Sequence, residues 1–320
     1  PPAVGATIRV LSTGQDHHEG HEQEEEPLCD LARSESSISI SSVLSLTTSS
    51  SSSIPKKRKL SPLVLKDLRI VEAPSEECAL YVPGLYKIFD EILVNALDQV
   101  IVSGDLVRHI DITIKDDGVI EVRNDGVGLP VEMSDACTPP CYVPELIFGH
   151  MLTSANYSED TERTVGGQNG IGAKACNIFS EFFEIETLDT SRGLLYKQRF
   201  EANMSTILKP DVKVCRNKRA WVKVSFLPDY ARFGLPGGLP DIMKRVMQRR
   251  IYDIAALTPS YVTVTFNGDK IPVKTFEQYV SLHTSGTGNM AYECIEYGWE
   301  VAVCLSLNGF QQVSFVNGLN

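Results

Sequence analysis

The chain has 320 residues, of which 42% are hydrophobic and 22% are charged, a composition typical of globular proteins with one large or two smaller domains. No apolar run approaches the about 18–20 residues of a membrane-spanning helix, and the N-terminus has no signal-peptide pattern, so no membrane partner is predicted. The formal net charge of −11 argues against a broad DNA-binding face within this chain.

The first 62 residues are predicted to be a disordered tail. An acidic, His-containing run at residues 17–26 and a serine-rich tract at residues 34–53 cannot bury enough apolar surface to offset their ordering entropy. Residues 55–60 (PKKRKL) resemble a monopartite nuclear-localisation signal, which predicts a nuclear location. The folded part is expected to begin near Leu63.

Residues 84–102 are predicted to form one amphipathic helix, because apolar residues recur at the spacing of a buried helix face. Glu91, Asn95 and Asp98 lie on the opposite side and project within about 60° of one another. Such a stripe is either a ligand-facing set of side chains or an ordinary solvated surface, and the helix alone does not decide between them.

A β-hairpin is predicted next, with strands at residues 110–115 and 119–124 joined by an Asp-Asp-Gly turn. The second strand runs into residues 124–130 (NDGVGLP). Glycines at alternate positions, Gly126 and Gly128, let a backbone approach a planar ligand closely, and Asn124 is placed to reach the edge of a base. Most strings of this kind are ordinary loops, so this signal is weak by itself.

Two further strings are suited to contacts with phosphate and ribose. A helix after Pro144 leads into the small polar residues 153–156 (TSAN). Residues 166–174 (GGQNGIGAK) then describe a flexible loop that feeds a helix N-terminus, where free N–H groups favour phosphate, and Lys174 can add a point charge. The spacing matches neither a Walker A loop nor a Rossmann fingerprint.

The remaining elements predict a mostly antiparallel sheet and the start of a second unit. Alternating runs at residues 182–188, 194–200, 220–227 and 261–266 indicate strands, and residues 241–257 indicate a helix. The turn at residues 267–269 is expected to mark a domain boundary. Residues 271–282 and strands at 299–307 and 311–317 would begin a second, incomplete α/β unit.

The eight cysteines are scattered, and Cys137 and Cys141 are the one close pair. No companion pair and no histidine lies at zinc-finger spacing from them, so no metal site is predicted there. Reduced thiols are the default expectation for an intracellular protein.

Taken together, the strings resemble the N-terminal ATPase region of eukaryotic-type DNA topoisomerase II, within the ATPase superfamily of gyrase, histidine kinases and MutL (GHKL). The motifs that carry the resemblance are residues 82–98 (VPGLYKIFDEILVNALD), 124–130 (NDGVGLP), 142–157 (YVPELIFGHMLTSANY) and 166–180 (GGQNGIGAKACNIFS), with weaker matches at 249–255, 266–276 and 309–317. The resemblance implies an α/β fold (an α+β two-layer sandwich): a Bergerat-type ATPase domain with a mixed, mostly antiparallel sheet at residues 63–267, followed by part of a transducer-like domain at 268–320.

The resemblance also implies roles for individual residues, with ATP and Mg²⁺ as cofactors. Glu91 would be the general base that activates the attacking water, and Asn95 would hold the metal ion. Asn124, Gly126 and Gly128 would form the adenine and ribose wall. The other expected nucleotide contacts are Ser154, Ala155 and Asn156 for ribose and phosphate, and the lid residues Gly167, Gln168, Asn169, Gly170, Ile171, Gly172, Ala173 and Lys174.

The function implied is the ATP-operated gate of a type IIA DNA topoisomerase, an enzyme that passes one DNA duplex through another. ATP binding would close two such domains into a homodimer around double-stranded DNA, which other parts of the full-length protein would bind and cut. The alternative is a non-catalytic ATP-binding or interaction protein derived from this domain. A histidine kinase is a distant third possibility, because His17, His18 and His21 lie in the acidic tail.

Several departures from the family pattern predict poor hydrolysis. Ala155 stands where the family usually has a second serine, which removes one hydrogen bond worth about 0.5–1.5 kcal/mol, and Gln168 replaces a lid arginine. The family's R-P-x-x-Y-I-G strap, its Gln-x-Lys lysine and its cleavage core have no counterpart in the sequence. Because the sequence also begins with Pro1 rather than Met, it is interpreted as a fragment.

Overall fold

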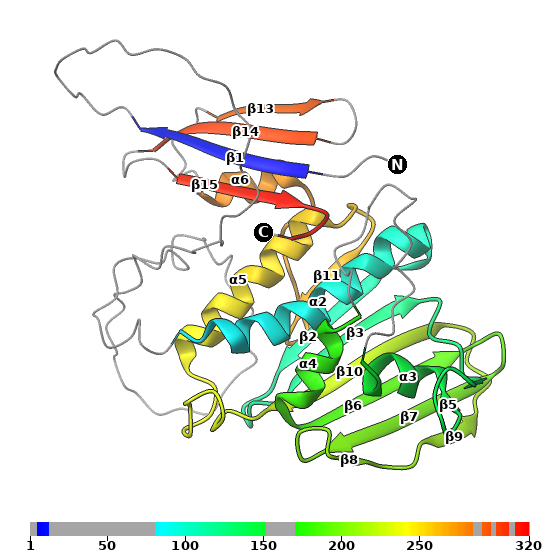
Figure 1. Ribbon diagram of the computed structural model, residues 1–320. Helices are drawn as coiled ribbons and strands as arrows, with labels where there is room; N and C mark the ends of the chain where they lie inside the picture. The colour runs from blue at the N-terminus through cyan, green and yellow to red at the C-terminus, as the bar shows by residue number, and fades with distance from the viewer. Residues whose placement is uncertain are drawn as a thin grey trace, which may run out of the picture.

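A computed structural model describes residues 5–12, 81–151, 170–283, 290–295, 299–306 and 311–319. Within these residues the chain forms a nine-stranded sheet, a four-stranded sheet and a short two-stranded pair. Helices pack on one face of the larger sheet, and the smaller sheet lies beyond the ends of two of them (Figure 1). This arrangement confirms the predicted α/β fold with a mostly antiparallel sheet.

The helix predicted at residues 84–102 is α2, Pro83–Ser103. It begins at a proline, whose fixed φ suits the first helical turn, and ends before Gly104, whose φ of 56° lies in the left-handed region that favours glycine. Its apolar side is fully buried, as Leu85, Phe89 and Leu93 have no exposed surface. The periodicity of the sequence therefore located both the helix and its buried face.

The larger sheet begins with the predicted hairpin. Strands β2 (His109–Ile114) and β3 (Ile120–Gly126) pair in antiparallel fashion, and buried and less buried positions alternate along both. The full order is β12-β11-β2-β3-β10-β6-β7-β8, with β9 also paired to β7. Its other strands are β6 (Ser180–Asp189), β7 (Leu194–Glu201), β8 (Thr206–Ile207), β9 (Asp211–Val214), β10 (Ala220–Pro228), β11 (Thr263–Phe266) and β12 (Asp269–Lys270).

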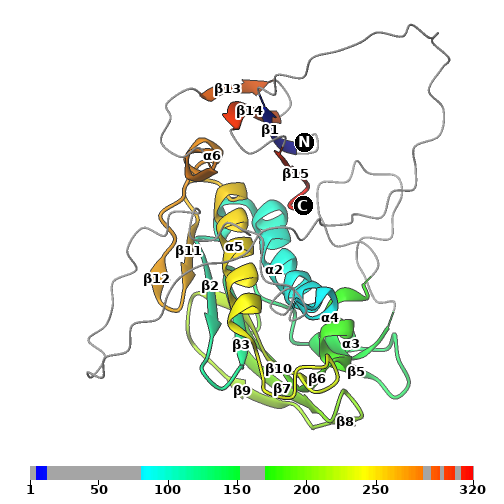
Figure 2. The ribbon, with the colours of Figure 1, turned by 90° about the vertical axis from the view of Figure 1, so that its left-hand side faces the viewer.

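Four helices lie on one face of this sheet, with α2 and α5 (Asp241–Leu257) side by side (Figure 2). The short helix α4 (Gly172–Ile178) packs on α2 and β6, and α3 (Val143–Gly149) packs on α4, with Phe148 against Phe183 of β6. A two-stranded pair, β4 (Met133–Ser134) with β5 (Cys141–Tyr142), precedes α3. None of the helices in the described part of the chain combines the length and the apolar character that a membrane crossing requires.

The smaller sheet has the order β13-β14-β1-β15. Strands β13 (Met290–Ile295), β14 (Trp299–Ser306) and β15 (Gln311–Val316) come from the C-terminal region, and helix α6 (Phe276–His283) contacts β14. Strand β1, Gly5–Ser12, lies between β14 and β15, parallel to the first and antiparallel to the second.

Strand β1 corrects the prediction of a disordered tail over residues 1–62. That prediction rested on the acidic and serine-rich tracts, whereas Gly5–Ser12 (GATIRVLS) contains the β-branched residues Thr7, Ile8 and Val10, which favour strands. The rest of the tail, including the basic cluster at residues 55–60 and the expected start of the fold at Leu63, lies outside the described residues.

The expected boundary at residues 267–269 falls inside the larger sheet. Asn267 and Gly268, both at positive φ, form the turn of the β11–β12 hairpin, and β12 adds an edge strand to that sheet. The sheet therefore continues through Lys270, beyond the boundary drawn from the sequence, because a turn signal does not distinguish a hairpin from a linker.

A buried ion-pair network joins the larger sheet's helices to the smaller sheet. Arg250 of α5 is 1% exposed, and its Nε donates to Asp90 Oδ1 of α2 at 2.7 Å. Its Nη2 donates to the carbonyl oxygen of Gly318, just after β15, at 2.6 Å. Asp253, 3.8 Å from Arg250 Nη1, accepts a hydrogen bond from Tyr279 of α6. One side chain thus contacts both helices and the segment that follows the last strand.

We expect Arg250→Ala to lower the free energy of unfolding by about 3–5 kcal/mol, because it leaves Asp90 and Asp253 buried without their cation. Urea unfolding followed by circular dichroism measures this loss. Arg245→Ala, an exposed arginine on the same helix, is the matched control and should change stability by less than about 0.5 kcal/mol. Equal effects of the two substitutions would contradict a structural role for the buried pair.

Candidate functional site

The polar stripe of α2 differs in one member from the sequence prediction. Glu91, Asn95 and Gln99 are partly exposed at successive turns, whereas Asp98 is 7% exposed. Residues four apart lie one above another on a helix, so the stripe runs through Glu91 and Asn95 and then Gln99. Asp98 is buried, so it does not belong to this partly exposed stripe.

The Glu91 carboxylate lies directly against the glycine-rich segment. A Cβ added to Gly172 would overlap Oε2, Cδ and Cγ of Glu91, so a residue with a side chain there would displace the glutamate. Lys87, one turn earlier, forms an ion pair with Glu91 Oε1 at 2.7 Å. Two strings far apart in sequence, the α2 stripe and the glycine-rich segment, are therefore brought together at one point.

Helix α4 carries the last residues of the predicted lid. Gly170 has a φ of 58°, Ile171 is 38% exposed, and Ala173 is buried. Lys174 is only 2% exposed, and this burial lowers its pKa to about 8 because removal from water disfavours the charged ammonium. The sequence predicted a point charge here, and the structure places that amine within the packed interior.

The end of β3 and the segment just after it carry Asn124, Gly126 and Gly128, the residues predicted to form the adenine and ribose wall. Asn124 is buried and pairs in register with Ile110 of β2 and Val222 of β10, and its Nδ2 donates to the carbonyl oxygen of Asp125 at 3.0 Å. A Cβ on Gly126 would press on Val107, and one on Gly128 would overlap the Leu188 carbonyl oxygen. Both glycines have positive φ. The strand end thus requires glycine at these two positions.

Asp125 secures the start of β2. Its Oδ1 accepts the backbone N–H groups of Arg108 at 2.7 Å and His109 at 2.8 Å, and its Oδ2 lies 3.0 Å from Nδ1 of His109. Burial acts to raise the pKa of Asp125, but the hydrogen bonds from His109 and Arg108 outweigh it and lower the pKa. The carboxylate therefore fixes the strand end by remaining ionised.

Asp189, at the end of β6, holds the segment that follows the β3 glycines. Its Oδ2 accepts the Val131 N–H at 2.9 Å, and its Oδ1 accepts from the backbone of Ser191 and Arg192. Burial acts to raise the pKa of Asp189, but the hydrogen bonds from Ser191, Val131 and Arg192 outweigh it and lower the pKa to about 2. Thr187 supplies a second anchor, since its Oγ1 accepts the Leu129 N–H at 3.0 Å.

The structure thus brings Glu91 beside Gly172 and places Asn95 on the same helix, and α2 also contacts strand β3, in which Asn124 and Gly126 lie. Ser154, Ala155, Asn156, Gly167, Gln168 and Asn169 lie outside the described residues. Sequence reasoning missed Lys87, although its spacing of four from Glu91 was a readable signal. It also missed Asp189, which has no local signal, because its partner Val131 is far away in the chain.

Comparison with known families defines the class of this site. Residues 81–201 match the family described as histidine kinase-, DNA gyrase B- and HSP90-like ATPases. This span begins at α2 and runs through β3, α3 and α4 to the end of β7. The region that carries the candidate site is therefore an ATPase domain of this family.

Within that family, the chain belongs with the ATPase region of eukaryotic DNA topoisomerase 2. It is 43% identical to DNA topoisomerase 2 of Arabidopsis thaliana over 247 residues, 75% of this chain and 17% of that protein. It is 44% identical to DNA topoisomerase 2 top-2 of Caenorhabditis elegans over 246 residues, which are 16% of that protein. The chain thus spans less than a fifth of the length of these relatives.

Solved structures agree with this placement. The crystal structure of the ATPase region of Saccharomyces cerevisiae topoisomerase II matches with a TM-score of 0.66 and 42% identity, over 69% of this chain and 58% of that one. The ATPase and transducer domains of DNA topoisomerase II from Balamuthia mandrillaris match with a TM-score of 0.65 and 37% identity, over 69% of this chain and 56% of that one.

We expect Asp189→Asn to reduce the free energy of unfolding by about 2 kcal/mol at pH 7, the equivalent of the pKa shift. Because the folded pKa is depressed, this stabilisation is present above the unfolded value of about 3.9 and is lost as the pH falls toward about 2. Urea unfolding at pH 7, 5 and 3 should show the two proteins converging at the lowest pH. A constant difference across this range would contradict the assignment.

Proposed function

We propose that this chain is the ATP-binding and ATP-hydrolysing gate of a type IIA DNA topoisomerase. The observation that carries the proposal is the contact between the Glu91 carboxylate and Gly172. It brings the one partly exposed carboxylate of the α2 stripe to the glycine-rich segment, which is where a triphosphate would be held.

Glu91 would act as the general base, orienting and activating the attacking water. That role needs a carboxylate held in one position, and the ion pair with Lys87 at 2.7 Å restrains Glu91. Gly172 matters because the carboxylate occupies the space of its missing side chain. Catalysis would then rest on positioning and charge stabilisation, as phosphoryl transfer generally does.

Mg²⁺ would be held by Asn95, one turn after Glu91 on the partly exposed stripe, and when bound it would neutralise charge on the phosphate oxygens. An amide oxygen is a suitable ligand for this hard cation. Asn124 would read the adenine or its ribose, with Gly126 and Gly128 as the wall. The remaining contacts would come from Ser154, Ala155, Asn156 and the lid, Gly167, Gln168, Asn169, Gly170, Ile171, Gly172, Ala173 and Lys174.

At the level of the whole protein, ATP binding would close two copies of this domain into a dimeric gate around double-stranded DNA, and hydrolysis would reopen it. Duplex DNA would be bound and cut elsewhere in the protein, since this chain has a net charge of −11. A nuclear location is proposed from the basic cluster at residues 55–60 and from the relation to eukaryotic topoisomerases.

A non-catalytic ATP-binding protein derived from this domain is the alternative. The observation that favours it is the pair of substitutions in the nucleotide strings, Ala155 for serine and Gln168 for arginine. The second removes a cation near the phosphates, where positive charge would stabilise the transition state. Both functions require nucleotide binding, which the first measurement below tests. They differ in turnover, which the second measurement tests.

ATP or a non-hydrolysable analogue should stabilise the chain in a Mg²⁺-dependent way. At a nucleotide concentration about 100 times the dissociation constant, the gain is about 2.7 kcal/mol, or a rise in melting temperature of about 5–10 °C. Differential scanning fluorimetry with and without Mg²⁺ measures it, and Asn95→Ala should remove the Mg²⁺ dependence. No shift at saturating nucleotide would sink the binding proposal.

Glu91→Gln should leave nucleotide binding intact and lower turnover by about 100-fold or more, since the amide cannot accept the water's proton. Single-turnover ATP hydrolysis detects slow rates well enough to make the comparison. Glu181→Gln, an exposed glutamate on β6, is the control and should keep the rate of the unsubstituted chain. Equal rates in all three proteins would reject Glu91 as the base. Nucleotide binding without turnover in the unsubstituted chain would favour the alternative function.

A further inference from the structure

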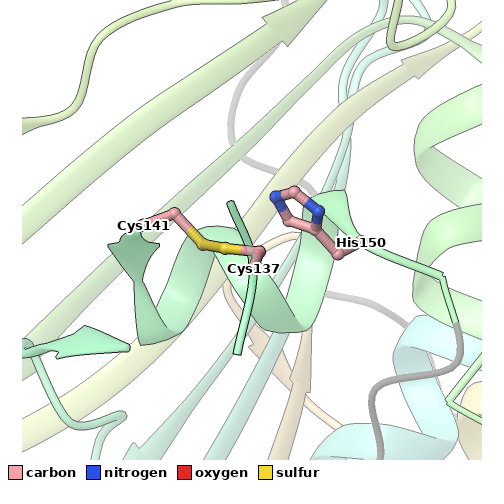
Figure 3. A group of neighbouring side chains, drawn as sticks. All are labelled: Cys137, Cys141 and His150. Atoms are coloured by element: carbon pink, nitrogen blue, oxygen red, sulfur yellow. A yellow bond between two sulfur atoms is a disulfide. The ribbon is translucent and has the colours of Figure 1, made fainter. Parts of the chain in front are cut away.

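A cluster of metal-binding side chains lies outside the nucleotide site. Cys137, Cys141 and His150 each place one ligand atom within 4.8 Å of the others, and they form the single group of three or more His, Cys, Asp or Glu side chains with this geometry among the described residues. Figure 3 shows a disulfide joining the two cysteines, with the His150 ring on the Cys137 side.

The sequence predicted neither feature. It gave reduced thiols and no metal site, because no histidine lies at zinc-finger spacing from the cysteine pair. The fold supplies the third group instead: His150 follows the last residue of α3, and that helix returns it to the cysteines that precede the helix. The zinc-finger spacing rule does not anticipate a cysteine and a histidine separated by the seven-residue helix α3.

The backbone around the cluster is held by hydrogen bonds. The N–H of His150 donates to the Leu146 carbonyl oxygen at 3.2 Å, and the N–H of Val143 donates to the Glu132 carbonyl oxygen at 2.9 Å. Cys141 pairs with Ser134 across the β4–β5 ladder. Cys141 and His150 thus come from backbone that is held by hydrogen bonds of its own, which favours a preformed metal site.

The three side chains of the cluster differ in their exposure to solvent. Cys141 is 7% exposed, and Cys137 and His150 are partly exposed. One sulfur is therefore shielded from water, while the other two groups leave an entry path. Two thiolates and an imidazole are soft to borderline ligands, and this set selects zinc over magnesium or calcium.

We propose that Cys137, Cys141 and His150, in the reduced chain, form a Zn²⁺ site with water as the fourth ligand. Zn²⁺ is typically four-coordinate, and three protein ligands plus water satisfy that number. The three proposed ligands come from the β4–β5 segment and from the residue after α3, whereas the proposed base and the Mg²⁺ ligand lie on the α2 stripe.

The metal-bound and disulfide forms exclude each other. Two molecules of a small thiol reductant convert the disulfide into two protein thiols, and the reductant becomes its own disulfide. Zn²⁺ then binds both sulfurs and releases their two protons. Oxidation would expel the metal, so occupancy of the site would follow the thiol redox state of its surroundings.

The test begins with the full chain, reduced by a phosphine. The reductant is removed under anaerobic conditions, and the protein is titrated with Zn²⁺ in competition with a chromophoric chelator. One equivalent of Zn²⁺ should bind in a way that Cys137→Ser and Cys141→Ser abolish and that His150→Ala weakens at least about tenfold. The control Cys294→Ser, an exposed free cysteine, should retain it. A triple substitution of His17, His18 and His21 to alanine should retain it too, which excludes the N-terminal histidines.

Co²⁺ provides a readout that does not depend on the variants folding. In the reduced, unsubstituted chain it should give thiolate-to-cobalt charge-transfer bands, and the same chain oxidised with a thiol oxidant such as diamide should give none. The proposal is overturned if the reduced chain shows no such bands, or if the oxidised chain binds Zn²⁺ equally well. The proposal is also overturned if Cys294→Ser loses the one equivalent of bound Zn²⁺ and Cys137→Ser keeps it.

Discussion

The arrangement of this chain depends on one buried cation. Arg250 contacts Asp90 of α2, lies beside Asp253 of its own helix and donates to Gly318 beyond β15. Burial acts to lower the pKa of Arg250, but Asp90 and Asp253 outweigh it and raise the pKa, so the guanidinium stays charged in the interior. Asp90 directly precedes Glu91 in α2. Arg250, by holding Asp90, therefore also fixes the orientation of the helix that carries the candidate base.

Glycines determine the shape of the candidate site around this helix. The carboxylate of Glu91 fills the space at Gly172, and the strand end after Asn124 passes close to Val107 and Leu188 where only glycine fits. Carboxylates at Asp125 and Asp189 then hold the neighbouring backbone through N–H groups. The larger sheet and its helices therefore provide a frame, and these glycines let its segments approach one another more closely than residues with side chains would allow.

Most of the larger sheet and its helices could be predicted from sequence, because burial on one face imposes a readable period. α2, α5 and the β2–β3 hairpin follow this rule. The nucleotide strings were also readable, since glycines and polar residues cluster locally in them. Features that depend on distant pairs were not predictable, because folding joins the residues of the Asp189–Val131 bond and of the Arg250 network. The Cys137–Cys141–His150 cluster is local, but its spacing matches no familiar metal motif. The prediction that Asp98 faces outward with Glu91 and Asn95 was wrong for a different reason. The angle between side chains on a helix does not show which of them other elements bury.

The position of β1 bears on how the chain folds. Residues 5–12 pair with β14 at residues 299–306 and with β15 at residues 311–316, and β1 separates these two strands in the sheet. Closing so long a loop costs entropy before any contact compensates for it, although each doubling of loop length adds only about 0.6 kcal/mol. The larger sheet and its helices are made of more local pairings, and such elements form faster. We expect β1, although it precedes every other strand described, to be among the last to pair, added when both β14 and β15 have been synthesised.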